Sequence, residues 1–412
     1  MRKLFLILIA FSTLVSYNSQ TNLDSLWSVW NNNTQPDTNR LKAMDEIVLA
    51  YMYNQPDSAF YFSELQYEFA KSIANKKFIA IALSKLGSAS MRQHNYKIAL
   101  EYHNKSLLIA KEIGDKELIA KNFGNIGQVY YSLDQFKEAL FYSNKTLAIA
   151  KEINDKHISC VVLRHMGLLY YEKKEYDSSL IYLQNSLDLA EYLGDKMQII
   201  YTLNDISRVY IQKTDYNNAI KLQKIIIRLA KEISNKNILS AAYTEIGIIR
   251  KLLGESGKKS AIEYFKKSLE IRKEIKWKEG IGWNLKDIGA TFNDLGEYDS
   301  ALFYLDKVIP IFESANNSLE IGYSLLMISK VHYQKNDIKR SLKYIKESKK
   351  VFFELNNQKG INEVNEFYTN LLIIKGEFNE ALKLLKPLES YYNKTDDLLN
   401  LKNINKNLYV VY

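Results

Sequence analysis

Apolar and polar residues recur along this chain with the spacing of amphipathic helices. Between residues 136 and 152, for example, Ala139, Tyr142, Leu147 and Ala150 fall on one side of a helix, which indicates a buried face. Short polar turns separate one such segment from the next. The pattern predicts a chain built from consecutive amphipathic helices.

One sequence unit returns at a fixed interval. Segments of similar pattern begin at Tyr96, Phe136, Tyr176 and Tyr216, which are 40 residues apart. One small residue of the unit can be followed over most of the chain, and only one step, across an insertion at 255–259, is 42 residues. This series predicts about nine copies of a unit with two antiparallel helices. Its members are Ala59, Ala99, Ala139, Ser179, Ala219, Ala261, Ala301, Ser341 and Ala381.

A second series of small residues lies twelve positions earlier in the units. Glycine inside a helix costs about 1 kcal/mol relative to alanine, so its recurrence requires a reason. We expect the two small residues of each unit to face each other, so that the two helix backbones cross closely. The second series comprises Gly87, Gly127, Gly167, Ser207, Gly289, Ser329 and Thr369, with Gly247 displaced by the insertion.

The ends of the units carry turn and cap signals. Gly114 and Gly194 stand where the end of a helix favours a left-handed residue, and Asp115 and Asp195 stand where the next helix favours an N-cap. We therefore expect short turns between the helices.

These positions together resemble the tetratricopeptide repeat. The typical unit has Gly at position 8, Tyr at 11, an aromatic residue at 17, Ala at 20 and a small residue at 27, and the 40-residue period resembles the long-helix variety of kinesin light chains. The resemblance covers residues 41–412 and implies a right-handed α-solenoid superhelix of about nine antiparallel helix pairs. The proline usual at the end of the second helix is absent, and the units around 247 and 369 are degenerate.

In the family that this chain resembles, the concave face built by the first helices binds peptides or partner helices. Carried over to this sequence, the inward positions 2, 5, 9, 12 and 13 give a candidate groove in three consecutive repeats. Such a groove could hold an acidic or carboxylate-ended segment with arginine as a bidentate anchor; a groove that is polar only because it is solvated is the alternative. The candidate residues are Lys121, Gln128, Tyr131, Arg164, Tyr171, Tyr201, Asn204, Arg208 and Gln212.

The first twenty residues have the layout of a secretory signal peptide: two cations, an apolar run from Leu4 to Val15, and then small and polar residues. We expect a signal peptide at 1–19, a lead-in at 20–40, and a periplasmic or otherwise extracytoplasmic location. Two alternatives for this segment remain open: an uncleaved segment that tethers the protein to the membrane, and a buried helix of the fold. No later segment reaches 18 consecutive apolar residues, so the sequence predicts no membrane span in the mature chain.

Composition supports a helical repeat and argues against several other classes. The 412 residues include only 4 Pro and 16 Gly, and Cys160 is the single cysteine, which excludes an intrachain disulfide framework. The net charge of +9 comes from basic residues interleaved with acids along the chain, so we expect a solvated surface and no nucleic-acid partner.

No catalytic constellation is recognisable. Gly257-Lys258-Lys259-Ser260 resembles the end of a phosphate-binding loop, but Leu252 stands where the leading glycine belongs, and we place the segment in an inter-helix insertion. His157 and Cys160 are three residues apart, which is an incomplete metal site, and we expect a half-buried structural cysteine. The sequence predicts a protein that is not an enzyme and has no cofactor and no metal.

Two functional hypotheses follow. The first is an exported, non-catalytic scaffold that binds a protein or peptide in its groove. The second is a truncated sensory input region: the segment 22–44 resembles the opening of bacterial envelope sensors, whose output is a class III nucleotide cyclase, a histidine kinase or a helix-turn-helix regulator. Residues 401–412 are in register with the repeat, so we expect the chain to stop inside an incomplete tenth unit. The ligand and the oligomeric state stay open.

Overall fold

The computed structural model describes residues 19–395 and 397–411. Within these ranges the chain forms helices α1 to α21 and no β-strand, so the predicted all-α fold is confirmed. The predicted signal peptide, residues 1–19, lies outside the described residues except for its last position. None of the described helices is long and apolar enough to cross a membrane.

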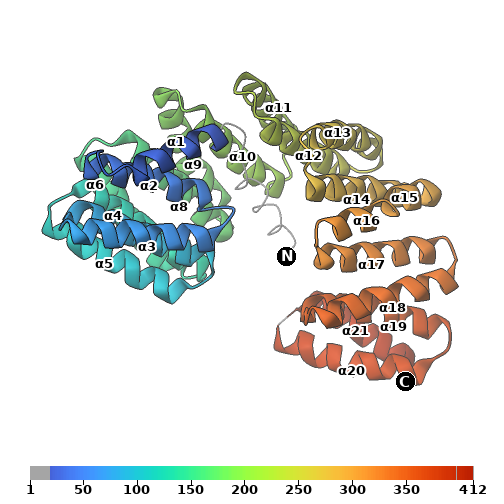
Figure 1. Ribbon diagram of the computed structural model, residues 1–412. Coiled ribbons are helices and arrows are strands. Elements are labelled where there is room, and N and C mark those ends of the chain that lie inside the picture. Colours follow the sequence, from blue (N-terminus) through green and yellow to red (C-terminus); the bar gives the residue numbers. More distant parts are fainter. Residues whose placement is uncertain (1–18, 396, 412) are drawn as a thin grey trace. The chain divides into compact units, whose positions relative to one another are not determined.

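The chain divides into two compact units, and the boundary in the sequence lies between Ser234 and Asn235. Unit 1 begins with α1, which spans the first part of the predicted lead-in and packs against α2, and continues as five helix pairs (Figure 1). The helices of unit 1 are α1 (Ser19–Asn31), α2 (Asp37–Tyr51), α3 (Pro56–Ser72), α4 (Lys76–Arg92), α5 (Tyr96–Glu112), α6 (Lys116–Ser132), α7 (Phe136–Glu152), α8 (Lys156–Glu172), α9 (Tyr176–Leu193), α10 (Lys196–Gln212) and α11 (Tyr216–Glu232).

Unit 2 continues the same pattern with four further pairs and a last single helix (Figure 1). We call the first helix of a pair its A helix and the second its B helix. The helices of unit 2 are α12 (Lys236–Leu252), α13 (Glu255–Glu274), α14 (Lys278–Asp294), α15 (Tyr298–Leu305), α16 (Val308–Ser314), α17 (Ser318–Gln334), α18 (Ile338–Glu354), α19 (Gln358–Ile374), α20 (Phe378–Lys394) and α21 (Leu398–Val411).

The predicted close crossing of the two helices in a pair is confirmed. All nine residues of the first small series, from Ala59 to Ala381, are completely buried. Where serine occupies a crossing position, it reaches the opposite backbone: Ser179 Oγ donates to the Gly167 carbonyl at 2.7 Å, and Ser329 Oγ donates to the Ser341 carbonyl at 2.7 Å. The backbones therefore approach closely enough for a hydroxyl to bridge them.

Glycines of the A helices make room for a side chain of the B helix, which lies four residues after the small residue at the crossing. A Cβ atom added to Gly167 would lie 2.6 Å from Leu183 Cγ, and one added to Gly289 would lie 2.7 Å from Leu305 Cγ. Both distances are shorter than carbon contacts allow, so these helix positions require glycine for packing.

The turns repeat more regularly than the sequence suggests. One residue with positive φ occurs every 20 residues from Ala74 to Gly254 and again from Lys276 to Gly376, and only five of these sixteen are glycine. Gly114 and Gly194 adopt the predicted left-handed conformation. Asp115 Oδ1 accepts from the Leu118 backbone N–H at 3.0 Å, which confirms the predicted cap.

One local expectation was wrong, and one local feature was not foreseen. The insertion at 255–259 is helical: it extends the start of α13 instead of forming an inter-helix loop, and Gly257 is needed there because an added Cβ would lie 2.0 Å from the Arg250 carbonyl oxygen. The B helix of the seventh pair is divided into α15 and α16. The division is explained by Pro310, which has no backbone N–H and whose ring prevents the usual hydrogen bond to the carbonyl of residue 306.

Candidate functional site

One side of the A helices in unit 1 carries a row of polar residues spaced 40 apart. We call this surface the A-helix face and define it by Asp45, Lys85, Asn125, His165 and Asp205, which lie on α2, α4, α6, α8 and α10. Side chains of successive A helices contact each other along it. The predicted groove residues lie along the same A helices of unit 1.

Two predicted arginines meet on this face around one carboxylate. Arg164 Nη1 of α8 donates to Asp205 Oδ2 of α10 at 3.0 Å, and Arg208 Nη1 lies 3.7 Å from Asp205 Oδ1. The Asp205 side chain is only 7% exposed. We call these three residues the arginine cluster. Asp205 holds two guanidinium groups beside each other while neutralising only one positive charge.

Tyrosine rings surround the arginine cluster. The Arg208 guanidinium lies 4.9 Å from the centre of the Tyr171 ring, and that of Arg164 lies 5.5 Å from the centre of the Tyr201 ring, distances suited to cation–π contacts. Tyr131 Oη donates to Glu172 Oε1 at 3.5 Å. Burial raises the pKa of all three tyrosines, so their hydroxyls remain protonated donors near neutral pH.

Arg208 remains a cation although it is mostly buried. Burial opposes its charge, but Asp205, Tyr171, Tyr131 and Glu172 together outweigh this effect and raise the pKa of Arg208. Its nearest carboxylate oxygen is 3.7 Å away, beyond ordinary hydrogen-bond distance. The guanidinium, with five N–H donors, therefore has capacity for a further acceptor.

The structure thus brings five of the nine predicted residues together: Tyr131, Arg164, Tyr171, Tyr201 and Arg208. Asn204 is turned partly towards α11, because its Oδ1 accepts from Gln223 Nε2 at 3.1 Å. Gln128 is half-buried on α6, and Gln212 is exposed at the end of α10. Lys121 lies apart, where it pairs with Glu117 at 2.5 Å and lines a separate pocket.

Sequence reasoning missed the two carboxylates that organise this site. Asp205 follows Arg164 by 41 residues, and Glu172 follows Tyr131 by 41 residues. One repeat plus one residue is the separation at which side chains of successive A helices meet on this face. A search for complementary residues at that separation would have found both.

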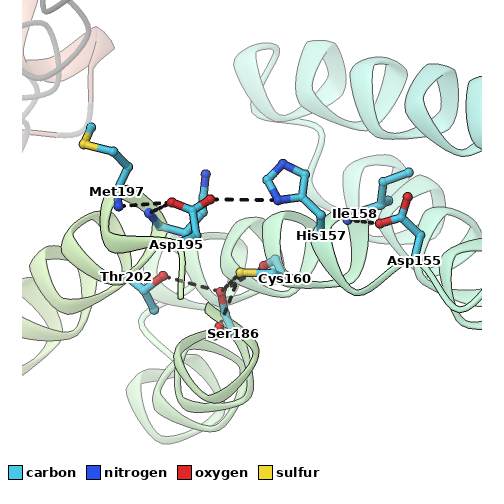
Figure 2. Close-up of polar contacts among 9 residues, drawn as sticks. Asp155, His157, Ile158, Cys160, Ser186, Asp195, Met197 and Thr202 are labelled. Atoms are coloured by element: carbon cyan, nitrogen blue, oxygen red, sulfur yellow. Dashed lines mark hydrogen bonds and ion pairs between the residues drawn. The ribbon is translucent and has the colours of Figure 1, made fainter. Parts of the chain in front are cut away.

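Cys160 and His157 face different neighbours and form no joint site (Figure 2). Cys160 is completely buried instead of half-buried as expected; its Sγ lies 3.4 Å from the Ser186 carbonyl, and burial raises the pKa of the thiol. His157 is 61% exposed and lies 4.0 Å from Asp195. Within the part of the chain that the structure describes, no group of three or more His, Cys, Asp or Glu residues could hold a metal ion.

Comparison with known proteins supports the repeat. A sequence model described as tetratricopeptide repeat matches residues 78–152, which cover α4 to α7. None of the curated proteins matches the sequence. Together with the tandem helix pairs, this match identifies a tetratricopeptide-type helical repeat scaffold.

Three solved structures illustrate the likeness. A signal transduction ATPase with numerous domains and a tetratricopeptide repeat sensor, from Pyrococcus horikoshii, is 16% identical with a TM-score of 0.58; the alignment covers 83% of this chain and 54% of that protein. The apo quorum sensor NprR from B. thuringiensis is 15% identical with a TM-score of 0.56, covering 84% and 97%. A Rap protein complexed with competence and sporulation factor is 13% identical with a TM-score of 0.51, covering 91% and 98%. At these identities the likeness concerns the fold, and this chain spans about half the length of the first protein.

Proposed function

We propose that this tetratricopeptide-type scaffold is non-catalytic and binds an acidic or carboxylate-ended peptide segment at the arginine cluster on the A-helix face of unit 1. The observation that carries the proposal is Arg208, a mostly buried cation with free donor capacity that is held in place by Asp205 and Tyr171. A planar guanidinium fixed in this way is suited to a carboxylate, because it can donate two parallel hydrogen bonds.

The tyrosines extend this site beyond a single charge. Tyr131, Tyr171 and Tyr201 supply rigid aromatic surface and protonated hydroxyls, the combination that commonly anchors peptides at protein interfaces. Asp205 acts as a positioning residue, since its removal would leave two adjacent guanidinium groups without their shared counter-ion.

A pull-down from an extract of the source cells, followed by fluorescence titration with the recovered segment as a synthetic peptide, tests the proposal. We expect the Arg164→Ala and Arg208→Ala double variant to bind that peptide at least tenfold more weakly, since each lost charged hydrogen bond is worth about 1.5–3 kcal/mol. Amidation of the peptide's carboxylate should weaken binding to the unmodified protein in the same way.

Arg228 provides a matched control, because it lies on α11 and its side chain is 71% exposed. Arg228→Ala should leave the affinity unchanged. If the double variant and the unmodified protein recovered every partner equally, the arginine cluster would not be the binding site.

We further propose that the scaffold acts outside the cytoplasm. The sequence of residues 1–19, with its two cations and short apolar run, supports export. Cell fractionation combined with sequencing of the mature N-terminus tests this, and a cytoplasmic protein that retains Met1 would contradict it.

A sensory input region is the second candidate. It is supported by the similarity of the fold to the P. horikoshii protein with a repeat sensor and to the quorum sensor from B. thuringiensis. Reading the coding frame beyond codon 412 separates the two functions: a continuing frame with an apolar span and an output domain supports the sensor, and intergenic DNA favours the scaffold alone.

A further inference from the structure

A second polar site lies on the A-helix face, away from the arginine cluster. It is a pocket of about 300 Å³ between α2, α4 and α6, and we call it the lysine pocket. Its lining includes Asp45, Lys85, Lys121, Glu117, Ser84 and Asn125. The volume is at the lower end of the range of about 300–1,000 Å³ for ligand sites, so the pocket suits a small ligand.

Two ion pairs at this pocket are complete. Lys77 Nζ lies 2.8 Å from Asp115 Oδ2, and Asp115 also caps α6. Lys121 Nζ lies 2.5 Å from Glu117 Oε1, one helical turn away. These four residues neutralise one another and serve the fold.

The third pair is incomplete. Lys85 Nζ lies 3.5 Å from Asp45 Oδ1, and the Asp45 Oδ1 atom is buried without a hydrogen-bond partner. Both side chains are mostly buried, with 19% and 26% exposed. Burial lowers the pKa of Lys85, and the nearby charge of Lys121 adds to this effect, while Asp45 opposes it. A cation and an anion thus line the same cavity, and their mutual contact only partly offsets the cost of desolvation.

We propose that the lysine pocket binds a free α-amino acid through its adjacent carboxylate and ammonium groups. The ligand carboxylate would accept from Lys85 Nζ, and the ligand ammonium would donate to the Asp45 carboxylate. The Ser84 hydroxyl already accepts from Asn125 Nδ2 at 3.1 Å, which leaves its own O–H free to donate to the carboxylate.

Charge balance selects this ligand class over others. A simple anion would be attracted by Lys85 but repelled by Asp45. A simple cation would be attracted by Asp45 but repelled by Lys85. A peptide carries its ammonium and carboxylate at opposite ends, so it cannot satisfy both groups in one small pocket. An α-amino acid carries its ammonium and carboxylate groups on one carbon atom, so both charges can reach a lysine and an aspartate that are 3.5 Å apart. The lysine pocket shares no residue with the arginine cluster, so amino-acid binding and peptide binding can be tested independently.

Isothermal titration of the full chain with the proteinogenic L-amino acids, one at a time, tests the proposal. We expect saturable binding of at least one of them. Its N-acetyl and its carboxamide derivatives, which each lack one charge, should bind at least roughly tenfold more weakly, because a hydrogen bond to a charged group is worth about 1.5–3 kcal/mol. Lys85→Met and Asp45→Asn should each cause a loss of the same order.

Lys76→Met is the matched control, since Lys76 is on α4 but its ammonium pairs with Glu112 outside the pocket. This variant should bind the amino acid as the unmodified chain does. Circular dichroism of each variant identifies any loss of folding, and Lys85→Arg, which retains the charge, provides a second substitution. If no amino acid binds, or if the blocked derivatives bind as well as the free amino acid, the proposal is wrong.

Discussion

At the scale of single residues, His103 occupies a position that is apolar in several other pairs, as at Leu183, Leu305 and Leu385. Where Ser63, Ser143 and Gln223 occupy it, their side chains donate hydrogen bonds. His103 is completely buried against Gly87, and neither ring nitrogen has a hydrogen-bond partner. An unsatisfied buried polar group costs about 1–3 kcal/mol, so this residue weakens its own repeat.

We expect His103→Leu to raise the free energy of unfolding by about 1–3 kcal/mol at pH 7. Burial lowers the pKa of His103 from 6.5 to about 4, so the unfolded chain binds the proton more readily than the folded chain. The stability of the unmodified protein should therefore fall by about 1.4 kcal/mol per pH unit as the pH drops from 6.5 towards 4, and the variant should lose this dependence.

Urea unfolding at pH 7 and pH 5 measures both effects. His157→Leu serves as the control, since His157 is exposed, and it should leave the stability at pH 7 unchanged. A His103→Leu protein that is less stable than the unmodified chain would show that the ring has a partner after all.

At the scale of elements, the turns between helices hold residues in a backbone conformation that most side chains disfavour. A left-handed residue occurs at every turn from Ala74 to Gly376, yet most of these positions carry side chains. Thr214, between α10 and α11, has φ +61° and a β-branched side chain, which is the least suited of these residues to that conformation. The preceding turn has Gly194, the residue that this conformation favours.

Thr214→Gly should stabilise unit 1 by about 1 kcal/mol, because relief of about 1–2 kcal/mol of backbone strain outweighs the greater freedom of glycine in the unfolded chain. Thermal unfolding measures the change. Thr395 ends α20 with φ −98°, so Thr395→Gly removes no strain and should give no gain. A lower midpoint for Thr214→Gly would indicate that its side chain stabilises the turn.

At the scale of the whole molecule, each helix pair packs mainly against its neighbouring pairs in the same unit. Stability in such an array is roughly the sum of the pairs and their interfaces. Among the described helices, α21 packs mainly against α20 and α19, and Leu398, Leu399 and Tyr409 on it are highly exposed. A helix with so few partners opens at low energetic cost.

Hydrogen exchange should therefore be faster in α21 than in helices flanked on both sides, such as α8. Exchange followed by mass spectrometry measures this profile on the purified chain. Equal protection of α8 and α21 would mean that the array unfolds as one cooperative block.

The sequence predicts most of this architecture because its small residues mark the crossings directly. Ala139 and Gly127 are recognisable without coordinates, since only small side chains fit where two backbones meet. The break before Pro310 was not predicted. A proline alone does not indicate such a break, because α20 contains Pro387 in its interior and is continuous. The position of Asp205 between two arginines was also missed, since it depends on how successive A helices stagger.

The regular spacing of the turns also bears on how such a gene can change in length. The junctions at 114–116 and 154–156 read Gly-Asp-Lys and Asn-Asp-Lys, and the helix pairs that end at them each carry an equivalent exposed ion pair, Lys76–Glu112 and Lys116–Glu152. Unequal recombination between two such junctions would delete or duplicate forty codons and rebuild an equivalent boundary. Arrays of this kind can therefore be shortened or extended by whole blocks, and each new copy can then acquire a surface of its own.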